Sequence, residues 1–301
     1  MSAPSSSVFR CGYVAILGAP NAGKSTLLNR LLGMKIAITS KRPQTTRTRI
    51  LGVVHRPGAQ MILLDTPGIH RARGPLNTRI VEAALGAMGD VDLLLWLMDA
   101  ERPDPESEAF LLEHLPSAGP PVLLAINKID RLTKEQILPL IDAWRQRWPF
   151  AAIVPVSARH GTQIEALEAE MARFLPEGPA LFPEDQVTDQ PERAIVTEMI
   201  REKVFRLTGA EVPYSTAVTV ERFHARPDRP LIEIHATIHL ERDSQKAIVI
   251  GKGGAKLRQV GEAARMDIER LLGAKVFLKL FVRVQKNWTR DAKAMQRFGY
   301  S

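Results

Sequence analysis

The chain has 301 residues, of which 45% are hydrophobic and 25% are charged. This length is enough for two globular domains with separate cores, and the composition excludes general disorder. The longest apolar run, Leu93 to Met98, is far shorter than the roughly 20 residues of a membrane-spanning helix, so we expect a soluble chain. The N-terminus lacks the basic and apolar regions of a secretion signal and predicts a flexible tail over residues 1–11. The single cysteine, Cys11, cannot form an internal disulfide, which fits a reducing cytosol.

The positive charge of the chain is concentrated near its C-terminus. Formal net charge is +8, from 41 Lys and Arg against 33 Asp and Glu. Residues 1–180 carry 20 basic and 17 acidic side chains, whereas residues 244–301 carry 13 basic and 4 acidic ones. This distribution predicts that a polyanion, either nucleic acid or an acidic membrane face, binds the C-terminal part. The alternative is that these side chains only keep the surface solvated.

Apolar runs alternate with helix-length segments in the first part of the chain. The runs lie at 13–18, 60–65, 91–99, 121–127 and 151–157. Continuous apolar strands separated by helices predict an α/β domain, over residues 12–176, with a mostly parallel sheet covered on both faces. The proline-rich and acidic segment 177–192 then breaks the pattern and is predicted to be an interdomain linker.

A second, α+β domain is predicted over residues 193–301. Its order is helix, strand, strand, helix, helix, strand, followed by a basic terminal helix. The corresponding segments are 193–208, 214–223, 231–240, a short helix around 247–250, 255–272, 275–284 and 287–298. A turn at 225–230 joins the two first strands, and the loop GKGG at 251–254 joins the two middle helices.

The sequence GAPNAGKS, residues 18–25, matches the phosphate-binding pattern G-x-x-x-x-G-K-[ST] between a predicted strand and a predicted helix. In this pattern backbone amides surround the phosphates, Lys24 reaches them, and the Ser25 hydroxyl binds Mg²⁺. The predicted nucleotide contacts here are Gly18, Ala19, Pro20, Asn21, Ala22, Gly23, Lys24, Ser25 and Thr26.

Three later segments resemble the other nucleotide loops of GTPases. DTPGI places Asp65, which would hold Mg²⁺ through water, before Gly68, whose amide would sense the γ phosphate. NKID resembles the guanine signature of these enzymes, in which the carboxylate of Asp130 would accept two hydrogen bonds that adenine cannot donate. VSA resembles the loop that contacts the guanine oxygen. The predicted contacts from these loops are Asp65, Thr66, Pro67, Gly68, Ile69, Asn127, Lys128, Ile129, Asp130, Ser157 and Ala158.

The polar segment KRPQTTRTRI lies where GTPases carry their first switch. There a threonine would close on Mg²⁺ and the γ phosphate only in the triphosphate state. Thr46 is the chosen residue because of the resembling pattern x-[TV]-T-R, with Thr45 as the alternative. The predicted catalytic residues are therefore Lys24, Thr46, Asp65 and Gly68. The predicted Mg²⁺ ligands are Ser25, Thr46 and, through water, Asp65.

One position departs from the best-known GTPases and bears on hydrolysis. Many GTPases place a water-orienting glutamine after the glycine of D-x-x-G, but this chain has Ile69 there, which predicts slow intrinsic turnover. Related GTPases with an apolar residue at this position often use a phosphate-loop asparagine to hold K⁺ against the phosphates. Asn21 matches that asparagine, and the alternative is that Asn21 only stabilises the loop.

The GKGG loop, in its helix-loop-helix setting, resembles the KH domain of the bacterial topology, type II, which clamps about four nucleotides of single-stranded backbone. The predicted RNA contacts are Ile248, Ile250, Gly251, Lys252, Gly253, Gly254, Lys256 and Arg258. Both isoleucines fit a base-binding groove and a buried core equally well. Aromatic residues do not interleave with the basic ones in a stacking pattern, so backbone clamping is expected in place of base stacking.

Together these motifs, with EVPYSTAV in the second domain, resemble the Era family of bacterial GTPases over nearly the whole chain. The resemblance implies GTP and GDP with Mg²⁺ as ligands, and a monomer that binds 16S rRNA near its 3′ end and the 30S subunit during maturation. It also implies a cytoplasmic protein with peripheral association with the inner membrane. One alternative is a membrane-associated signalling GTPase whose basic tail binds anionic lipid. Another is an inert nucleotide domain that only stabilises an RNA binder.

Overall fold

The structure is a computed structural model that describes residues 8–39, 50–69, 81–82, 85–86, 88–116, 118–208, 212, 216–227 and 229–298. Internal contacts divide the chain into two compact units, and the first gives way to the second between Asp189 and Gln190. That division falls inside the segment predicted to link two domains. By the same contacts, the short stretch 37–39 belongs to the second unit, although the residues up to Ile36 belong to the first.

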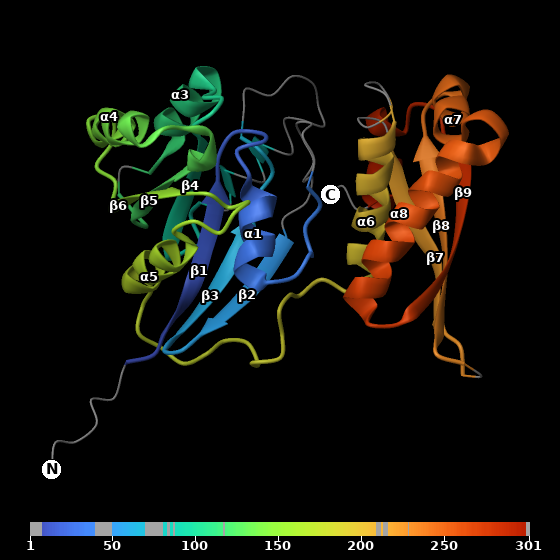
Figure 1. The fold of residues 1–301 in the computed structure, drawn as a ribbon, viewed down its shortest axis with the longest axis horizontal. Helices are drawn as coiled ribbons and strands as arrows, with labels where there is room; N and C mark the ends of the chain where they lie inside the picture. Colours follow the sequence, from blue (N-terminus) through green and yellow to red (C-terminus); the bar gives the residue numbers. More distant parts are fainter. Residues whose placement is uncertain are drawn as a thin grey trace, which may run out of the picture. The chain divides into compact units, whose positions relative to one another are not determined.

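The first unit is an α/β layer structure built on a six-stranded sheet in the order β2-β3-β1-β4-β5-β6. All neighbouring strands are parallel except β2 and β3, and Figure 1 shows α1 and α5 in front of the sheet. The elements are β1 Arg10–Leu17, α1 Lys24–Leu32, β2 Ile50–Arg56, β3 Ala59–Asp65, β4 Leu93–Asp99, α3 Pro105–His114, β5 Val122–Asn127, η1 Ile129–Arg131, α4 Lys134–Arg145, β6 Ala152–Val156 and α5 Ile164–Phe174. The predicted mostly parallel sheet is confirmed.

Burial explains why the central strands are apolar along their whole length. Every residue of β4 and β5 is buried, as expected when helices cover both faces. On one face, Trp96 of β4 meets Trp144 of α4 edge to face, with ring centroids 5.1 Å apart. Because both indoles are almost fully buried, the polar residues that end these strands are held on a rigid base.

Strand β2 is absent from the sequence prediction. It pairs antiparallel with β3, from Ile50 opposite Asp65 to Arg56 opposite Ala59. Its first residue, Ile50, is also the last residue of the polar segment KRPQTTRTRI, so no apolar run marks the start of the strand. Pro57 and Gly58 then form the turn of a hairpin, and this turn was the available signal.

Two predicted irregular segments are more ordered than expected. Arg10 and Cys11, placed in the flexible tail, begin β1, because their amides donate to Gly58 O and Pro176 O at 3.0 Å. The predicted linker also lies along the first unit, where the Val53 amide donates to Val187 O at 2.9 Å. Proline removes donors from this segment but leaves its remaining amides and carbonyls free to pair with a sheet edge.

The second unit confirms the predicted order of helices and strands. Its elements are α6 Glu192–Leu207, β7 Ala217–Ala225, β8 Leu231–Leu240, α7 Asp243–Ile250, η3 Lys252–Gly254, α8 Ala255–Leu272, β9 Lys275–Val284, η4 Trp288–Arg290 and α9 Ala292–Arg297. The strands form one sheet in the order β7-β8-β9, in which β8 is antiparallel to β7 and parallel to β9. Together, one antiparallel sheet pair, one parallel pair and the α7-α8 crossover give an α+β unit.

A buried histidine lies where the end of this sheet meets α9. One hydrogen bond of 2.8 Å joins His239 Nε2, on β8, to Thr219 Oγ1. Its ring packs on Phe298 with centroids 4.6 Å apart. Burial, followed by the charges of Arg297 and Arg283, lowers the pKa of His239 to about 4, although Glu221 opposes the shift.

We therefore expect His239 to make the second unit sensitive to acid. The folded-state pKa lies below the unfolded value of about 6.5, so stability is complete above pH 6.5 and falls as the pH drops toward 4. At pH 5 the free energy of unfolding should be lower than at pH 7 by roughly 2 kcal/mol. Urea unfolding at the two pH values measures this difference. His239→Gln should reduce this pH dependence, whereas His224→Gln, at an exposed histidine, should leave it unchanged. The same loss of unfolding free energy between pH 7 and pH 5 in all three proteins would contradict the assignment.

Candidate nucleotide and RNA sites

The phosphate loop connects β1 to α1 through a backbone that only glycine can follow. Gly18 and Gly23 have φ values of 145° and 106°. A Cβ at Gly18 would lie 2.2 Å from Leu97 O, and a Cβ at Gly23 would lie 2.4 Å from the side-chain nitrogen of Asn127. The loop is therefore packed directly against the ends of β4 and β5, which leaves its amides turned to the opening at the start of α1.

Lys24 is the buried cation of this loop. Its Nζ donates to Gly18 O at 2.9 Å and to Ala19 O at 3.0 Å, so the amine is folded over the loop. Burial lowers the pKa of Lys24 to about 8, and the charge of Asp65 only partly opposes this shift. A buried amine with carbonyl partners and a depressed pKa fits a site that is completed by an anion.

A hydroxyl and a carboxylate suited to a hard cation meet beside the loop. Ser25 Oγ donates to Asp65 Oδ2 at 2.7 Å, and Asp65 is fully buried. Oxygen donors of this kind fit Mg²⁺, which commonly binds proteins through one or two side chains plus phosphate and water. Thr66 Oγ1 donates to Ile16 O at 2.7 Å, so the residue after Asp65 is tied back to β1.

Gly68 and Ile69 pass close to the phosphate loop. A Cβ at Gly68 would lie 2.8 Å from Pro20 Cα, and the Ile69 amide donates to Gly18 O at 3.1 Å. The Ile69 side chain is fully buried in the apolar cluster that also contains Leu17 and Trp96. It is therefore withdrawn from any water at the phosphates, as well as being unable to hydrogen-bond one.

Asn21, predicted either to hold K⁺ or to stabilise the loop, has an exposed side chain. Its φ of 66° is in the left-handed region, which asparagine adopts more readily than most residues. Among the residues that the structure describes, the Asn21 side chain has no hydrogen-bond partner. Its backbone shapes the loop, and its amide oxygen is available to a ligand.

Three loops meet at the end of β5. Asn127 Nδ2 donates to Ala22 O at 2.7 Å, and the Ala158 amide donates to Asn127 Oδ1 at 3.0 Å. Ser157 Oγ donates to Asp130 Oδ1 at 2.6 Å, and this hydrogen bond helps to lower the pKa of Asp130, against the opposing effect of burial. The carboxylate is thus charged and oriented, as a receptor for two N–H donors must be.

Two residues that support these loops were not identified from the sequence. Asp99, at the end of β4, accepts from the Glu101 and Arg102 amides at 3.0 and 3.1 Å and forms an ion pair with Lys128. Arg30 of α1 donates from Nε to Ala158 O at 3.2 Å. The position of Asp99 at the carboxyl end of a strand was a usable signal, whereas Arg30 belongs to no motif.

The structure brings the remaining predicted nucleotide residues into the same loops. Ile129 begins η1, and Lys128 before it has a φ of 68°. Ala19 and Ala22 contribute carbonyl oxygens to the bonds described above, and Pro20 lies against Gly68. Thr26 lies in the first turn of α1, and Pro67 lies in the loop after β3. Thr45 and Thr46 lie outside the described residues.

The last described residue before the predicted switch is held by α6. The Thr39 amide donates to Glu202 Oε1 at 2.9 Å, and Arg206 Nη2 donates to Thr39 O at 2.9 Å and Thr39 Oγ1 at 2.8 Å. Glu202 is fully buried, and it also pairs with Lys203 and Arg206 at 3.2 and 3.1 Å. The described chain that leads into the predicted switch is therefore fixed within the second unit at Thr39.

The GKGG loop adopts a backbone that exposes its basic residues. Gly251, Gly253 and Gly254 have φ values of 69°, 58° and 79°. A Cβ at Gly251 would lie 2.7 Å from the Cβ of Lys256, so this position requires glycine, whereas a Cβ at Gly253 would meet open space. Lys252 is exposed on the turn itself. Such a loop allows a phosphate backbone to approach closely.

The two isoleucines before this loop differ in burial. Ile248 is 43% exposed and Ile250 is half-buried, whereas Val249 between them is fully buried. Val249 therefore belongs to the core. Ile248 does not, so the core alternative fails for it and its contact with RNA stays a prediction.

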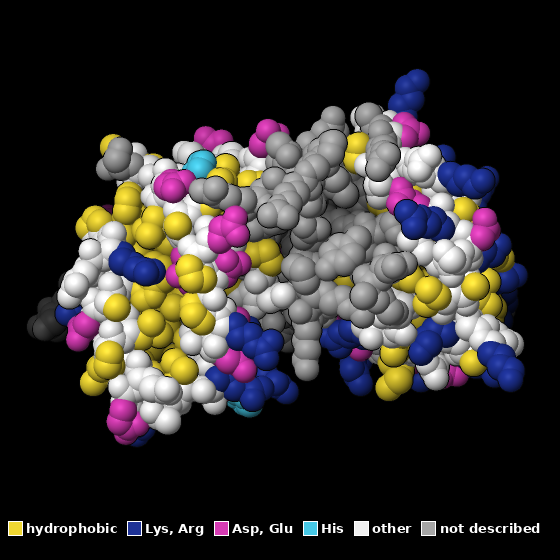
Figure 2. All heavy atoms as spheres, turned by 90° about the horizontal axis from the view of Figure 1, so that it is seen from above, with side chains coloured by type: hydrophobic (Ala, Val, Ile, Leu, Met, Phe, Trp, Pro, Cys, Tyr) yellow, Lys and Arg dark blue, Asp and Glu magenta, His cyan; other side chains and the backbone are white. Residues whose placement is uncertain are grey.

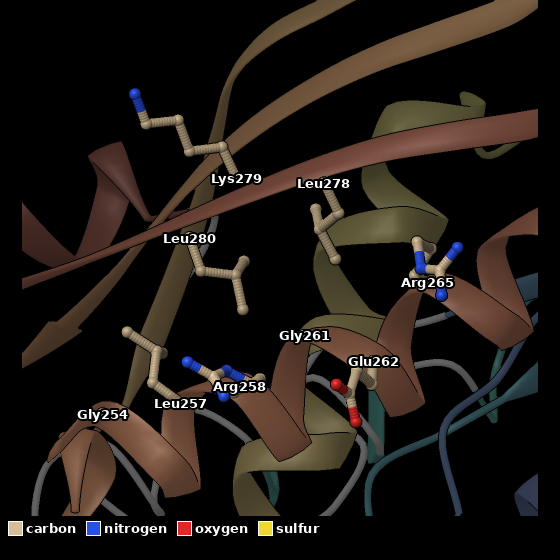
Figure 3. Close-up of a pocket in the computed structure, with 9 residues that line it drawn as sticks. All are labelled: Gly254, Leu257, Arg258, Gly261, Glu262, Arg265, Leu278, Lys279 and Leu280. Carbon is tan, nitrogen blue, oxygen red and sulfur yellow. The ribbon is translucent and has the colours of Figure 1, made fainter.

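A groove of about 350 Å³ lies between α8 and β9 (Figure 3). Leu278 and Leu280 of β9 point toward α8, and Arg258 and Arg265 of α8 line the opposite side. The exposed Arg258, predicted from the sequence, thus lies at a hollow with an apolar floor, and two arginines against the one acid Glu262 leave its rim net cationic. This combination suits bases with their phosphates.

The prediction that aromatic and basic residues do not interleave is wrong for β9. Phe277 and Phe281 are 51% and 41% exposed, and they alternate with the exposed Lys275, Lys279 and Arg283. The sequence predicts KVFLKLFVRV as a strand, without a solvent-exposed face. Period-two alternation instead places both rings on the face turned away from the groove.

Because the pKa of Lys24 is about 8 without an anion, we expect nucleotide binding to be coupled to proton uptake. The phosphates of a bound nucleotide would raise this pKa, so the protein would take up about half a proton per GDP at pH 8 and close to none at pH 6.5. Calorimetric titration in two buffers with different ionisation enthalpies measures the uptake. Equal uptake at the two pH values would contradict the assignment.

Comparisons with known proteins agree with this geometry. Residues 13–128 match a family model described as 50S ribosome-binding GTPase, and residues 211–289 match a KH domain model. GTPase Era from Geobacter metallireducens is 53% identical, over 97% of this chain and 98% of that protein. GTPase Era from Syntrophus aciditrophicus is 46% identical, over 98% and 96%.

Two solved structures match with a TM-score of 0.93 and 40% identity. One is a point variant of Aquifex aeolicus Era bound to GDP and aluminium fluoride, matched over 97% of this chain and 100% of that one. The other is Era in complex with MgGDPNP and nucleotides 1506–1542 of 16S ribosomal RNA, matched over 97% and 99%. The chain therefore belongs to the Era family of GTPases.

Proposed function

We propose that this GTPase uses its nucleotide state to control how its KH domain holds the 3′ region of 16S rRNA during maturation of the 30S subunit. The observation that carries the proposal is the presence of both sites in one chain. Lys24, Asp65 and Asp130 lie in intact nucleotide loops, and the GKGG loop adjoins a groove with a cationic rim. The solved complex of Era with MgGDPNP and a 16S rRNA fragment supports this assignment.

The domain limits that we propose are 12–176 for the GTPase, 177–192 for the linker and 193–301 for the KH domain with its basic helix. The division of the described structure between Asp189 and Gln190 supports the linker position. Packing of the Val187 carbonyl against β2 suggests that only the last few linker residues act as a hinge. We further propose that the protein acts as a monomer.

The phosphates of GTP would lie over the loop from Gly18 to Ser25. There the backbone amides and the charge of Lys24 would neutralise them, and Ser25, Thr46 and Asp65, the last through water, would hold Mg²⁺. Bound Mg²⁺ would supply charge neutralisation at the β and γ phosphates. Gly68, held against Pro20, would present its amide to the γ phosphate.

We assign the role of the absent glutamine to a potassium ion beside Asn21. The buried Ile69 cannot orient water, and the Asn21 side chain is exposed on the phosphate loop. GTP turnover should therefore be at least severalfold faster in KCl than in NaCl, because a second cation would stabilise charge on the transferring phosphoryl group. Asn21→Ala should lose this dependence while still binding GDP. Equal turnover of the unaltered protein in both salts would contradict the assignment.

Coupling between the two sites would pass through Thr39 and α6. Thr39, two residues before the predicted switch, is held by Glu202 and Arg206 within the second unit, and closure of the switch on the γ phosphate would change the forces on these bonds. RNA affinity should consequently differ between complexes with a GTP analogue and with GDP. Arg206→Ala removes the hydrogen bonds from Arg206 to Thr39, leaves those to Glu202, and should shrink the ratio of the two affinities by roughly fivefold, as filter binding with single-stranded RNA measures.

Two variants make the coupling experiment specific. Arg270→Ala removes an arginine of α8 that has no bond to Thr39 among the described residues, and it should leave the ratio of affinities unchanged. Gly253→Asp should weaken RNA binding in both nucleotide states, because it places a negative charge on the loop that would hold phosphates. An unchanged ratio for Arg206→Ala would contradict the proposed route.

Anionic lipid at the inner membrane is the secondary partner that we propose for the basic second unit, where Figure 2 shows many Lys and Arg side chains. The described helices include none with the length and apolar character that crossing a membrane requires. Binding to anionic vesicles that is lost in Gly253→Asp, with RNA binding unchanged, would reverse the order of the two partners.

A further inference from the structure

The sheet of the second unit has one covered face and one partly open face. Along β8 and β9, residues such as Ile234, Ile238 and Val276 are buried against the helices. The alternate residues face the other way, and α9 covers them only at the end marked by the contact between His239 and Phe298. The rest of this outer face contains no helix from the described part of the chain.

Three rings form a row on the open part of this face. Phe277 and Phe281 are 51% and 41% exposed, far more than aromatic side chains of a finished core. His235 of β8 lies between them, with its ring centroid 6.5 Å from Phe277 and 6.2 Å from Phe281, edge to face in both pairs. The row therefore offers ring faces on a rigid, twisted sheet.

The charges around the rings are cationic and partly unpaired. Lys279 contacts the Phe281 ring at 5.1 Å but forms no ion pair with a described residue, and neither does Arg283. Glu233 and Glu221 are acids on this face. Glu233 pairs with Arg222, Arg226 and His235 at 3.3, 3.4 and 2.9 Å, and Glu221 accepts a hydrogen bond from Thr237 Oγ1 at 2.6 Å. The basic residues Arg222, Arg226, Lys279 and Arg283 outnumber these two carboxylates, so the outer face remains cationic.

We propose that this face is a second binding surface for the same RNA, on which single-stranded bases stack against Phe277 and Phe281 while Lys279 and Arg283 contact phosphates. The proposal rests on RNA binding by the KH groove. Stacking on aromatic rings beside a cationic track binds single strands with little sequence preference.

Strand β9 makes the two surfaces continuous. It is the edge strand of the sheet, so no further strand separates the groove from the outer face. Leu278 and Leu280 point into the groove, whereas Lys279 between them points away (Figure 3). An RNA strand leaving the groove has only this single strand to cross before it meets the rings.

The chemistry of the face favours RNA over a protein or a membrane. A stable protein interface buries about 800 Å² on each partner around an apolar centre. Two half-exposed phenylalanines among charged side chains supply much less apolar surface. Anchoring in a lipid interface would need apolar groups that project beyond the polar ones, but these rings lie among Lys279, Arg222 and Arg283 on the same sheet face.

Two RNA lengths separate the surfaces in an experiment. A tetranucleotide fills the groove, and a dodecanucleotide can extend past it, with 2-aminopurine in place of a base outside the groove segment. Phe277→Leu with Phe281→Leu keeps apolar side chains but removes the rings. It should weaken dodecamer binding at least tenfold and abolish 2-aminopurine quenching, with tetramer affinity unchanged.

Two further variants control for folding and for general exposure. Phe277→Trp with Phe281→Trp should retain both the affinity and the quenching. Met266→Ala removes an exposed apolar side chain of α8, 52% exposed, and should change neither. Because the tetramer reports on the groove alone, a failed groove and a failed outer face give different results. The proposal would be overturned if the double leucine variant bound the dodecamer as well as the unaltered protein does. It would also be overturned if, with dodecamer binding unchanged, this variant lost binding to anionic vesicles or lost a dimer that the unaltered protein forms.

Discussion

The nucleotide site depends on one buried side chain, the amide of Asn127. Its nitrogen donates to the phosphate loop at Ala22 and its oxygen accepts from the amide of Ala158, so a single planar group joins loops that are more than 100 residues apart in the chain. The side chain is 2% exposed, and both of its polar atoms are satisfied. A buried amide in this position is worth more than two ordinary hydrogen bonds, because losing it would leave the partners buried and unpaired.

The glycines of the phosphate loop follow from the same constraint. Gly23 has no room for a Cβ because Asn127 occupies the space, and Gly18 has none because Leu97 O does. Close packing therefore draws the loop onto the strand ends, and the strand ends in turn hold the base-binding residues. Asp99 extends this support by pairing with Lys128 from the neighbouring strand, so three consecutive strands of the sheet order fix both halves of the nucleotide site.

The features that could be predicted from the sequence are those that a short stretch of residues determines. The α/β alternation, the glycine-rich loops and the bounds of α8 and β9 are properties of short windows, and the structure reproduces them. Arg30 and Asp99 were missed because their roles arise from strand order and helix packing, which no short window contains. The exposure of Phe277 and Phe281 was missed for a related reason. Alternation along β9 shows which residues share a face, but only the packing of α7, α8 and α9 shows which face is covered.

The described residues on either side of the predicted switch segment belong to different units. One end, at Thr39, is hydrogen-bonded to α6 through Glu202 and Arg206. The other end, at Ile50, is paired with Asp65, the carboxylate of the predicted Mg²⁺ site. In the coupling that we propose, closure of the switch on the γ phosphate would change the forces on the hydrogen bonds between Thr39 and α6. Within the second unit α6 packs on both α8 and β7, so such a change would reach the helix that follows the GKGG loop through direct contacts. The proposed route therefore uses the covalent chain between Thr39 and Ile50 and the packed helices of the second unit.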